Sequence, residues 1–233
     1  MNEVIAFDSP HVCSYLPERT AVLPLRFQRV QVTAEEFDAC LAAGDRRTGR
    51  FLYRTACPAC QACEPIRLDL ESFQPNQTQR REWRKGNDLL TVKIGLPAVD
   101  DERVALFNLH QQLRRLKEND EDLVDNESYC QFLTSSCCRT QEFAYYSGNE
   151  LVAVAIADSG SESLSAVYCF YDPRFRAVSL GTYSVLRQID HCRQTGRRFL
   201  YLGFYIAESP HMAYKAKFHP HQRLIGGAWR DFA

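Results

Sequence analysis

The sequence predicts an α+β protein, with a small N-terminal α/β part packed against a larger C-terminal part. Three observations support this. The 233 residues are 45% apolar and 24% charged, which is typical of a globular chain that can bury a sizeable core. Helical and strand-like patterns alternate along the chain, with most strands in the second half. No apolar run reaches the roughly 18 residues that a membrane-spanning helix needs.

The N-terminal part contains one helix and two strands with clear boundaries. Thr33 and Glu36 form a capping box that starts a helix through Leu41, and Gly44 ends it. A short strand is expected at 51–53. Further along, Ile66, Leu68 and Leu70 alternate with charged residues, which predicts a half-buried strand. Beyond the N-terminal part, an apolar stretch at 89–94 predicts a third strand.

The C-terminal part begins with two predicted helices. Residues 100–117 form the clearest one, because apolar side chains recur at helical spacing on one face: Val104, Phe107, Leu113 and Leu116. A second helix is expected from an Asn126 cap through Phe132. Three strands follow, with turns at 148–149 and around Gly160, and we expect them at 142–147, 151–157 and 164–171.

The last predicted elements are a helix at 182–193, stopped by Gly196, and a bulky apolar strand at 199–206. Gly203 lies inside that strand, where a missing side chain lets a ligand or a bulge approach the backbone. Ser209 as N-cap and Pro210 at the first helical position then predict a short helix.

The most natural boundary in the chain lies between about residues 73 and 97, where prolines bracket a basic stretch. We therefore predict an N-terminal domain at 1–75, a basic connecting segment at 76–97 and a larger C-terminal domain at 98–233.

Charge and the first residues exclude several classes of protein. A net charge of −1 argues against indiscriminate DNA binding, although a local basic patch can still bind RNA. Residues 1–10 have acidic side chains and no cationic stretch, so we expect no signal peptide, no membrane partner and a cytoplasmic location. In that compartment the ten cysteines are expected to be thiols or ligands rather than disulfides.

Several motifs resemble one family. Residues 201–206 (YLGFYI), 212–220 (MAYKAKFHP), 167–173 (VYCFYDP) and 180–183 (LGTY) resemble the C-terminal half of arginyl-tRNA–protein transferases, in the same order. Near the start, YLPER at 15–19 and LPLR at 23–26 resemble the short bacterial branch, the aspartate/glutamate leucyltransferases. The resemblance covers nearly the whole chain.

The resemblance implies a fold and an activity. The element order of the C-terminal part is similar to the GNAT acyltransferase fold, which the catalytic half of this family adopts. The implied activity is transfer of leucine from leucyl-tRNA to an N-terminal Asp or Glu of acceptor proteins, which marks them for proteolysis. The implied partners are leucyl-tRNA and those proteins. Aminoacyl-tRNA is the donor substrate, and no cofactor is required.

The strand at 199–206 and the helix after it hold the candidate catalytic groups. Direct attack of an α-amine on an activated ester needs alignment, proton removal and support of an oxyanion. Backbone N–H groups near Gly203 could meet the oxyanion, and Tyr201, Tyr205 and Tyr214 could supply hydrogen bonds. The residue types alone fit a buried strand followed by solvated lysines equally well.

Cations in two regions are candidates for binding the acceptor carboxylate, since arginine and lysine pair with carboxylates. These candidates are Arg19, Arg26, Lys215 and Lys217. For the tRNA we predict a basic set on the connecting segment and near the first strands: Arg46, Arg47, Arg50, Arg80, Arg81, Arg84 and Lys85. A solvated helix face is the alternative for the basic segment.

The spacing C-x-x-C-x-x-C at 57–63 suits thiolate ligands of zinc or an iron–sulfur cluster. The candidates are Cys57, Cys60 and Cys63, with Cys13 as a fourth. Longer eukaryotic relatives carry a different cysteine pattern, so packed or redox-active thiols remain the alternative.

Three other functions stay open at this point. An arginyl-tRNA–protein transferase would need a carboxylate in its donor pocket. Glu208 is the acid nearest the strand at 199–206. A non-catalytic module could bind acidic N-termini or RNA. An acyl-CoA N-acetyltransferase is less favoured, because the turn at 174–181 has a single glycine where that class places a glycine-rich pyrophosphate site.

Overall fold

One large sheet organises the protein. The computed structural model describes residues 3–114 and 123–233. The sheet has the strand order β14-β13-β7-β12-β11-β10-β9-β8. Its paired strands run antiparallel except β11 and β12, which are parallel. The strands are β7 (Glu64–Asp69), β8 (Thr91–Gly95), β9 (Thr140–Ser147), β10 (Glu150–Ser159), β11 (Ser163–Tyr171), β12 (Phe199–Tyr205), β13 (His221–Ile225) and β14 (Ala228–Phe232).

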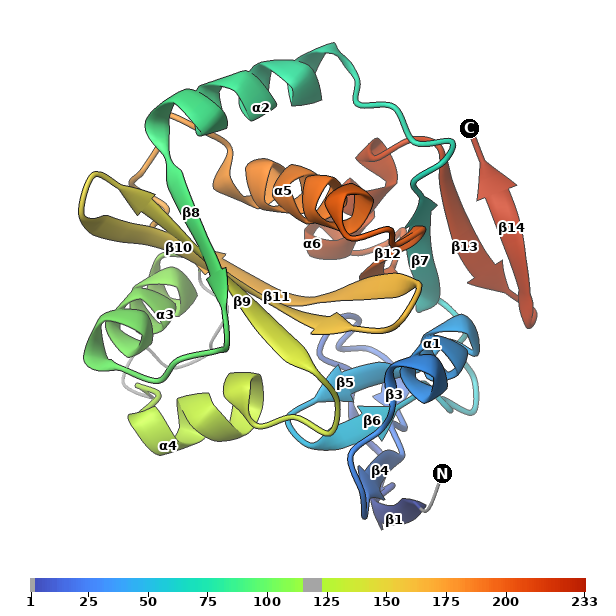
Figure 1. The fold of residues 1–233 in the computed structure, drawn as a ribbon. Coiled ribbons are helices and arrows are strands. Elements are labelled where there is room, and N and C mark those ends of the chain that lie inside the picture. Colours follow the sequence, from blue (N-terminus) through green and yellow to red (C-terminus); the bar gives the residue numbers. More distant parts are fainter. Residues whose placement is uncertain (1–2, 115–122) are drawn as a thin grey trace.

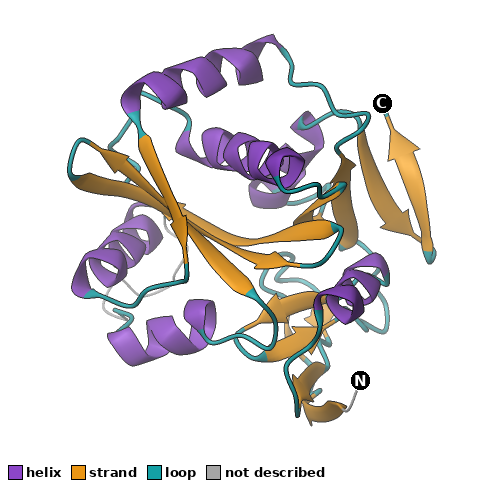
Figure 2. Ribbon diagram, viewed as in Figure 1, coloured by secondary structure: helices purple, strands orange, loops and turns teal. Residues whose placement is uncertain are grey.

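Helices cover both faces of this sheet (Figure 1). On one face lie α2 (Gln77–Leu89) and α5 (Leu180–Gln194). On the other lie α3 (Asp101–Leu113), α4 (Asn126–Tyr129) and the π-helical turn η1 (Cys130–Thr134). Successive residues of β10 face opposite sides, as a strand requires. Ala153 and Ala155 therefore pack under α5, whereas Val154 packs under α3. The α+β prediction is confirmed, and Figure 2 shows helices and strands in these separate layers.

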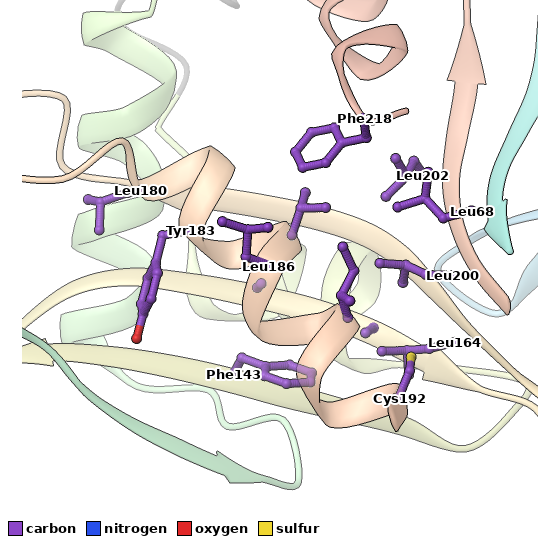
Figure 3. Packing of buried hydrophobic residues seen from close by; sticks show 14 of the residues in the cluster. Leu68, Phe143, Leu164, Leu180, Tyr183, Leu186, Cys192, Leu200, Leu202 and Phe218 are labelled. Carbon is purple, nitrogen blue, oxygen red and sulfur yellow. The ribbon is translucent and has the colours of Figure 1, made fainter. Parts of the chain in front are cut away.

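The main core lies between α5 and the sheet (Figure 3). Tyr183 and Leu186 of α5 share one buried cluster with Phe143 and Leu200 of the strands. Burying each such side chain contributes about 1.5–3 kcal/mol to folding. A Cβ on Gly86 of α2 would lie 2.3 Å from the Tyr183 ring, so the missing side chain allows α2 to pack closely on α5.

A smaller sheet and one helix form the N-terminal part. The sheet has the order β1-β4-β6-β5, and a separate pair of short strands lies beside it. The helix α1 packs through Phe37 and Leu41 onto Tyr201 of β12. The elements are β1 (Glu3–Phe7), β2 (His11–Val12), β3 (Thr20–Ala21), β4 (Leu25–Gln28), α1 (Ala34–Ala42), β5 (Arg46–Thr48) and β6 (Phe51–Tyr53).

The two parallel strands pair over only a short distance. β11 and β12 are in register from Ser163 to Ser165 and from Phe199 to Tyr201, and no further pairs follow. On its other edge β12 pairs with β7, and the register shifts by one residue between Tyr201 and Phe204. Gly203 lies in that bulge with a φ of +84°, a conformation that favours glycine. Of the two interpretations of Gly203, a ligand or a bulge at the backbone, the structure shows the bulge.

Most predicted boundaries agree with the structure. The capping box at Thr33, the turn at Gly148 and the stop at Gly196 are all present. Ser209 and Pro210 start α6 (Pro210–Ala213), which continues as the 3₁₀ turn η2 (Tyr214–Lys217). The Ser209 hydroxyl makes no capping hydrogen bond, however, so the mechanism expected for that helix start was wrong.

Other expectations need correction. The second helix is capped by Asp125, not Asn126, because the Asp125 carboxylate accepts from the Ser128 N–H. Leu113, expected on the buried face of α3, is 49% exposed because it lies in the last turn of that helix. Leu116 and Lys117 lie outside the described residues. The strand expected from residue 89 begins at Thr91, since α2 extends to Leu89. The hairpin of β13 and β14 was not predicted.

The proposed domain division stays a prediction. β7, from residues 1–75, pairs with β12 and β13 within the large sheet.

Candidate active site

A cavity of about 830 Å³ opens where β11 and β12 diverge. Its walls come from residues 166–171 of β11, the start of α5, Leu202 of β12, and α6 with η2. Tyr15 of the N-terminal part and side chains of α2 and α3 complete the lining. The cavity therefore collects groups from segments that are far apart in the sequence, as active sites in other folds do.

Much of the cavity wall is apolar. Leu202 and Met212 line it together with Val178, Leu180 and Phe218. Leu200, on the same strand as Leu202, is buried in the main core.

Acidic groups are almost absent from the wall. Among the described residues that line the cavity, Glu82 is the only carboxylate, and its Oε2 accepts a 2.8 Å hydrogen bond from the Ser179 N–H. Glu208 does not line the cavity and pairs with Arg19 at 2.7 Å.

Lys215 reaches the cavity from η2. Its Nζ donates a 2.8 Å hydrogen bond to the Phe204 carbonyl and lies 3.4 Å from the Met212 sulfur. Burial of the amine and the charge of Arg46 lower the pKa of Lys215 to about 7. No carboxylate of the described residues pairs with it, so the ammonium could receive an anionic substrate group.

Arg46 approaches the same bulge from β5. Its Nη2 donates a 2.8 Å hydrogen bond to the Gly203 carbonyl, and the guanidinium lies over the Tyr201 and Phe204 rings. Burial lowers its pKa to about 10, so it stays charged at neutral pH. Its Nε is buried without a hydrogen-bond partner.

The candidate catalytic tyrosines separate in space. Tyr214 lines the cavity. Tyr201 is buried on the opposite side of β12, where its hydroxyl accepts from Arg67 at 3.0 Å and its ring packs edge-on against Trp229. Tyr205 lies under the Arg223 guanidinium at 4.6 Å and does not line the cavity. The catalytic roles given to these residues and to Gly203 stay predictions.

The candidate acceptor-binding cations also separate. Arg19 pairs with Glu208, and Arg26 pairs with Asp45 at 2.5 Å and with Glu3 at 3.2 Å. Lys217 is exposed outside the cavity lining. Of the four candidates, Lys215 is the one that lines the cavity.

The candidate tRNA-binding cations fall into two sets. Arg80, Arg81, Arg84 and Lys85 are exposed on α2, and Arg50 is exposed beside Phe27. Arg46 and Arg47 are buried. The Arg47 Nε donates to Asp158 at 2.5 Å, and its other nitrogens donate to the carbonyls of Gly49, Leu133 and Ser135. The exposed set is therefore the one that RNA can reach.

The cysteines of the N-terminal part make contacts of their own. The Arg19 Nη1 donates to the Cys60 sulfur at 3.2 Å, and the Val22 N–H donates to the Cys57 sulfur at 3.4 Å. Burial, with Cys13, Cys57 and Cys60 nearby, raises the pKa of the Cys63 thiol to about 12. Across residues 3–114 and 123–233, no three His, Cys, Asp or Glu side chains are arranged to hold a metal ion. The metal interpretation stays a prediction, and no step below depends on it.

Several cavity residues were not singled out from the sequence. Tyr168 lines the cavity, and its hydroxyl accepts a 2.7 Å hydrogen bond from Gln111. His110 lines it too, with its Nδ1 2.9 Å from the Tyr171 carbonyl. Tyr15, Tyr168 and Tyr171 lie inside the motifs that carried the resemblance, so those motifs already held the signal. Arg114 and Arg176 lie outside those motifs.

Comparison with known proteins identifies the family. Residues 11–81 match the family described as "Arginine-tRNA-protein transferase, N terminus", and residues 102–225 match its C terminus. The chain belongs to this transferase family. An aspartate/glutamate leucyltransferase from Saccharophagus degradans is 37% identical over 234 residues, covering 100% of this chain and 98% of that protein. One from Chromobacterium violaceum is 36% identical, covering 95% and 91%. The predicted resemblance and the transferase class are confirmed.

Solved structures extend the comparison at the level of the fold. The C-terminal domain of a putative lysylphosphatidylglycerol synthetase from Agrobacterium fabrum matches with a TM-score of 0.52 and 15% identity, over 87% of this chain and 64% of that one. L-PGS from Bacillus licheniformis matches with a TM-score of 0.50 and 15% identity, over 74% and 59%. The transferase chain thus spans less than two thirds of either. None of its described helices is long and apolar enough to cross a membrane.

Proposed function

We propose that this protein transfers leucine from leucyl-tRNA to the N-terminal Asp or Glu of acceptor proteins. The new peptide bond gives the acceptor an N-terminal leucine, which marks it for proteolysis. The names of its relatives support the reaction. The observation that carries the choice of donor is the cavity, because much of its wall is apolar and its only carboxylate among the described residues accepts from a backbone N–H.

The cavity favours leucine over arginine on energetic grounds. A leucine side chain gains about 1.5–3 kcal/mol when it is fully buried against apolar groups such as Leu202 and Met212. A buried guanidinium without a carboxylate partner costs several kcal/mol. Glu82 is committed to Ser179, and Glu208 is committed to Arg19 outside the cavity. The other oxygen of Glu82 lies 3.7 Å from the Arg81 guanidinium, so the charge of this carboxylate already has a cation beside it.

The transfer needs no covalent enzyme intermediate. The acceptor α-amine, after losing a proton, attacks the ester carbonyl, and the 3′-terminal ribose oxygen of the tRNA leaves and takes up a proton. Cys169 is the one thiol among the described residues that line the cavity. Burial raises its pKa to about 11, so it stays protonated and is a poor nucleophile at neutral pH.

Lys215 is the group that we assign to the acceptor. Its ammonium lines the cavity without a carboxylate partner, and the acidic side chain of an N-terminal Asp or Glu would supply one. The charge of Arg46, behind the Gly203 bulge, adds to the positive potential there.

The tRNA body is assigned to the outer face of α2. Arg80, Arg81 and Arg84 are exposed there on one helix. Their replacement by alanine should weaken leucyl-tRNA binding several-fold, with a smaller salt dependence because fewer counterions are released. Unchanged affinity at physiological salt would refute this assignment.

The fold and the location complete the proposal. We assign the C-terminal part to the GNAT type of acyltransferase fold, on the order of its helices and strands. We expect the protein to act in the cytoplasm, where charged tRNA is available.

A competition experiment tests the proposed reaction. The purified protein receives leucyl-tRNA and arginyl-tRNA together, with a peptide that begins with Asp, and the product mass is read. A leucine adduct is expected. A dominant arginine adduct would overturn the donor but leave the transferase class standing, and acetylation from acetyl-CoA alone would overturn both. Binding of the peptide without any transfer would favour a non-catalytic module.

A further inference from the structure

Three exposed cations line the cavity from three different elements. Lys85 comes from α2, Arg114 directly follows α3, and Arg176 lies in the loop before α5. Among the described residues, no carboxylate forms a salt bridge with any of them. Neighbouring arginines differ in this respect: Arg174 pairs with Asp172 at 2.8 Å, and Arg103 pairs with Glu142 at 2.7 Å. Three cations without a carboxylate partner among the described residues thus line one cavity.

Two exposed tyrosines line the same cavity. Tyr15 is 38% exposed and Tyr214 is 42% exposed, although both contribute to the wall. A positively charged groove with accessible aromatic rings is the combination that binds single-stranded nucleic acid, because cations contact phosphates and rings stack on unpaired bases.

The start of α5 adds positive potential in the same place. Gly181 and Thr182, in the first turn of this 15-residue helix, line the cavity. The N-terminal end of a helix carries a partial positive charge. Glu82 already occupies the Ser179 N–H, so the exposed cations remain the groups free to bind an incoming anion.

We propose that Lys85, Arg114 and Arg176 bind the phosphates of the single-stranded 3′ end of the donor tRNA, with Tyr15 and Tyr214 as stacking surfaces for its terminal bases. This inference rests on the proposed function. In a charged tRNA the leucyl ester is attached to the last ribose, so the preceding phosphates must lie close to the cavity whenever the leucyl group occupies its apolar wall. The site differs from the outer face of α2, whose arginines do not line the cavity.

The test compares two variants of equal charge change. The cavity variant replaces Lys85, Arg114 and Arg176 by alanine. The matched control replaces one lysine and two arginines that are exposed and do not line the cavity: Lys93, Arg139 and Arg230. Urea denaturation confirms that both variants are as stable as the unaltered protein, which is expected because all six positions are exposed.

Two donor substrates distinguish binding of the phosphates from reaction of the ester. One is a leucyl-CCA trinucleotide, which keeps the last phosphates, and the other is leucyl-adenosine, which has none. With leucyl-CCA, kcat/KM of the cavity variant should fall roughly tenfold or more, whereas the control stays within about twofold. With leucyl-adenosine the two variants should be equal. Equal rates with leucyl-CCA as well would overturn the proposal.

A binding assay without catalysis distinguishes a failure of this site from a failure of the proposed function. The probe is an uncharged, fluorescently labelled RNA oligonucleotide that ends in CCA, measured by anisotropy at several salt concentrations. Losing three phosphate contacts should lower the magnitude of the slope of log K against log salt by about 2 in the cavity variant alone. A selective loss here with no leucine transfer by the unaltered protein would overturn the proposed function and keep this site. An equal slope in both variants would overturn the site.

Discussion

The guanidinium of Arg46 donates a 2.8 Å hydrogen bond to the carbonyl oxygen of Gly203. Lys215 lies on the other side of the same residue, with its Nζ 3.4 Å from the position a Gly203 Cβ would take. A β-bulge in the central sheet thus holds two cations next to a cavity.

Replacing Gly203 by alanine should damage both stability and activity. The left-handed backbone at this position costs an alanine about 1–2 kcal/mol, which urea denaturation measures. Strain at this position should also shift the neighbouring Phe204 carbonyl, which accepts from the Lys215 amine at 2.8 Å, and so raise KM for Asp peptides. Gly148→Ala is the matched control, because Gly148 has a φ of +60° and nothing within 4 Å of a Cβ. Normal KM in Gly203→Ala would contradict the placement of Lys215 at the acceptor.

Acceptor binding should depend on pH through Lys215. Burial and Arg46 lower its pKa to about 7, and the protonated amine is the form that pairs with a carboxylate. KM for an Asp peptide should therefore be lowest below pH 7 and rise as the pH increases through 7. Lys215→Arg should flatten this rise, because an arginine stays protonated over that range.

Removing the Lys215 charge should weaken acceptor binding most below pH 7, where the amine is protonated. Lys215→Ala should cost about 2–5 kcal/mol in kcat/KM for Asp peptides if the pair is desolvated, while affinity for leucyl-tRNA is kept. Lys217→Ala provides the comparison, since its side chain lies outside the cavity. If the two alanine variants behave alike, the acceptor carboxylate binds elsewhere.

Replacing Arg47 should lower the stability of the protein rather than its affinity for RNA. Its side chain and that of Asp158 have no exposed surface, so Arg47→Ala leaves a buried carboxylate without a cation beside it. The expected loss in the free energy of unfolding is about 3–5 kcal/mol by urea denaturation. Arg50→Ala, on the exposed neighbour, should change stability by less than about 0.5 kcal/mol. An Arg47→Ala protein of normal stability that binds tRNA weakly would restore the role expected from the sequence.

The cysteine run should be dispensable for the reaction itself, because direct attack uses no thiol. Cys57→Ser should transfer leucine at a normal rate, measured with charged tRNA and an Asp peptide. The purified protein should also be analysed for iron, zinc and acid-labile sulfide. Loss of activity in a folded, metal-free Cys57→Ser protein would point to a thiol in the reaction.

The sequence by itself determined the elements that depend on local signals. The capping box at Thr33, the turn at Gly148 and the apolar strand at 199–206 could be predicted because caps, glycine conformations and apolar runs act within a few residues. The extended motifs likewise identified the family before any geometry was known. The weaker hairpin of β13 and β14 escaped prediction, since its strands depend on pairing with β7.

Only the tertiary structure decided which side chains share the site. Arg46, Arg47 and Arg50 are close in sequence and equally basic, yet β5 buries the first two and leaves Arg50 exposed. Arg114 and Arg176 carried no local signal, and they meet Lys85 only because three separate elements surround the gap between β11 and β12. Burial and partners are properties of the packed chain: the same lysine type is a surface charge at Lys217 and a cavity amine with a lowered pKa at Lys215.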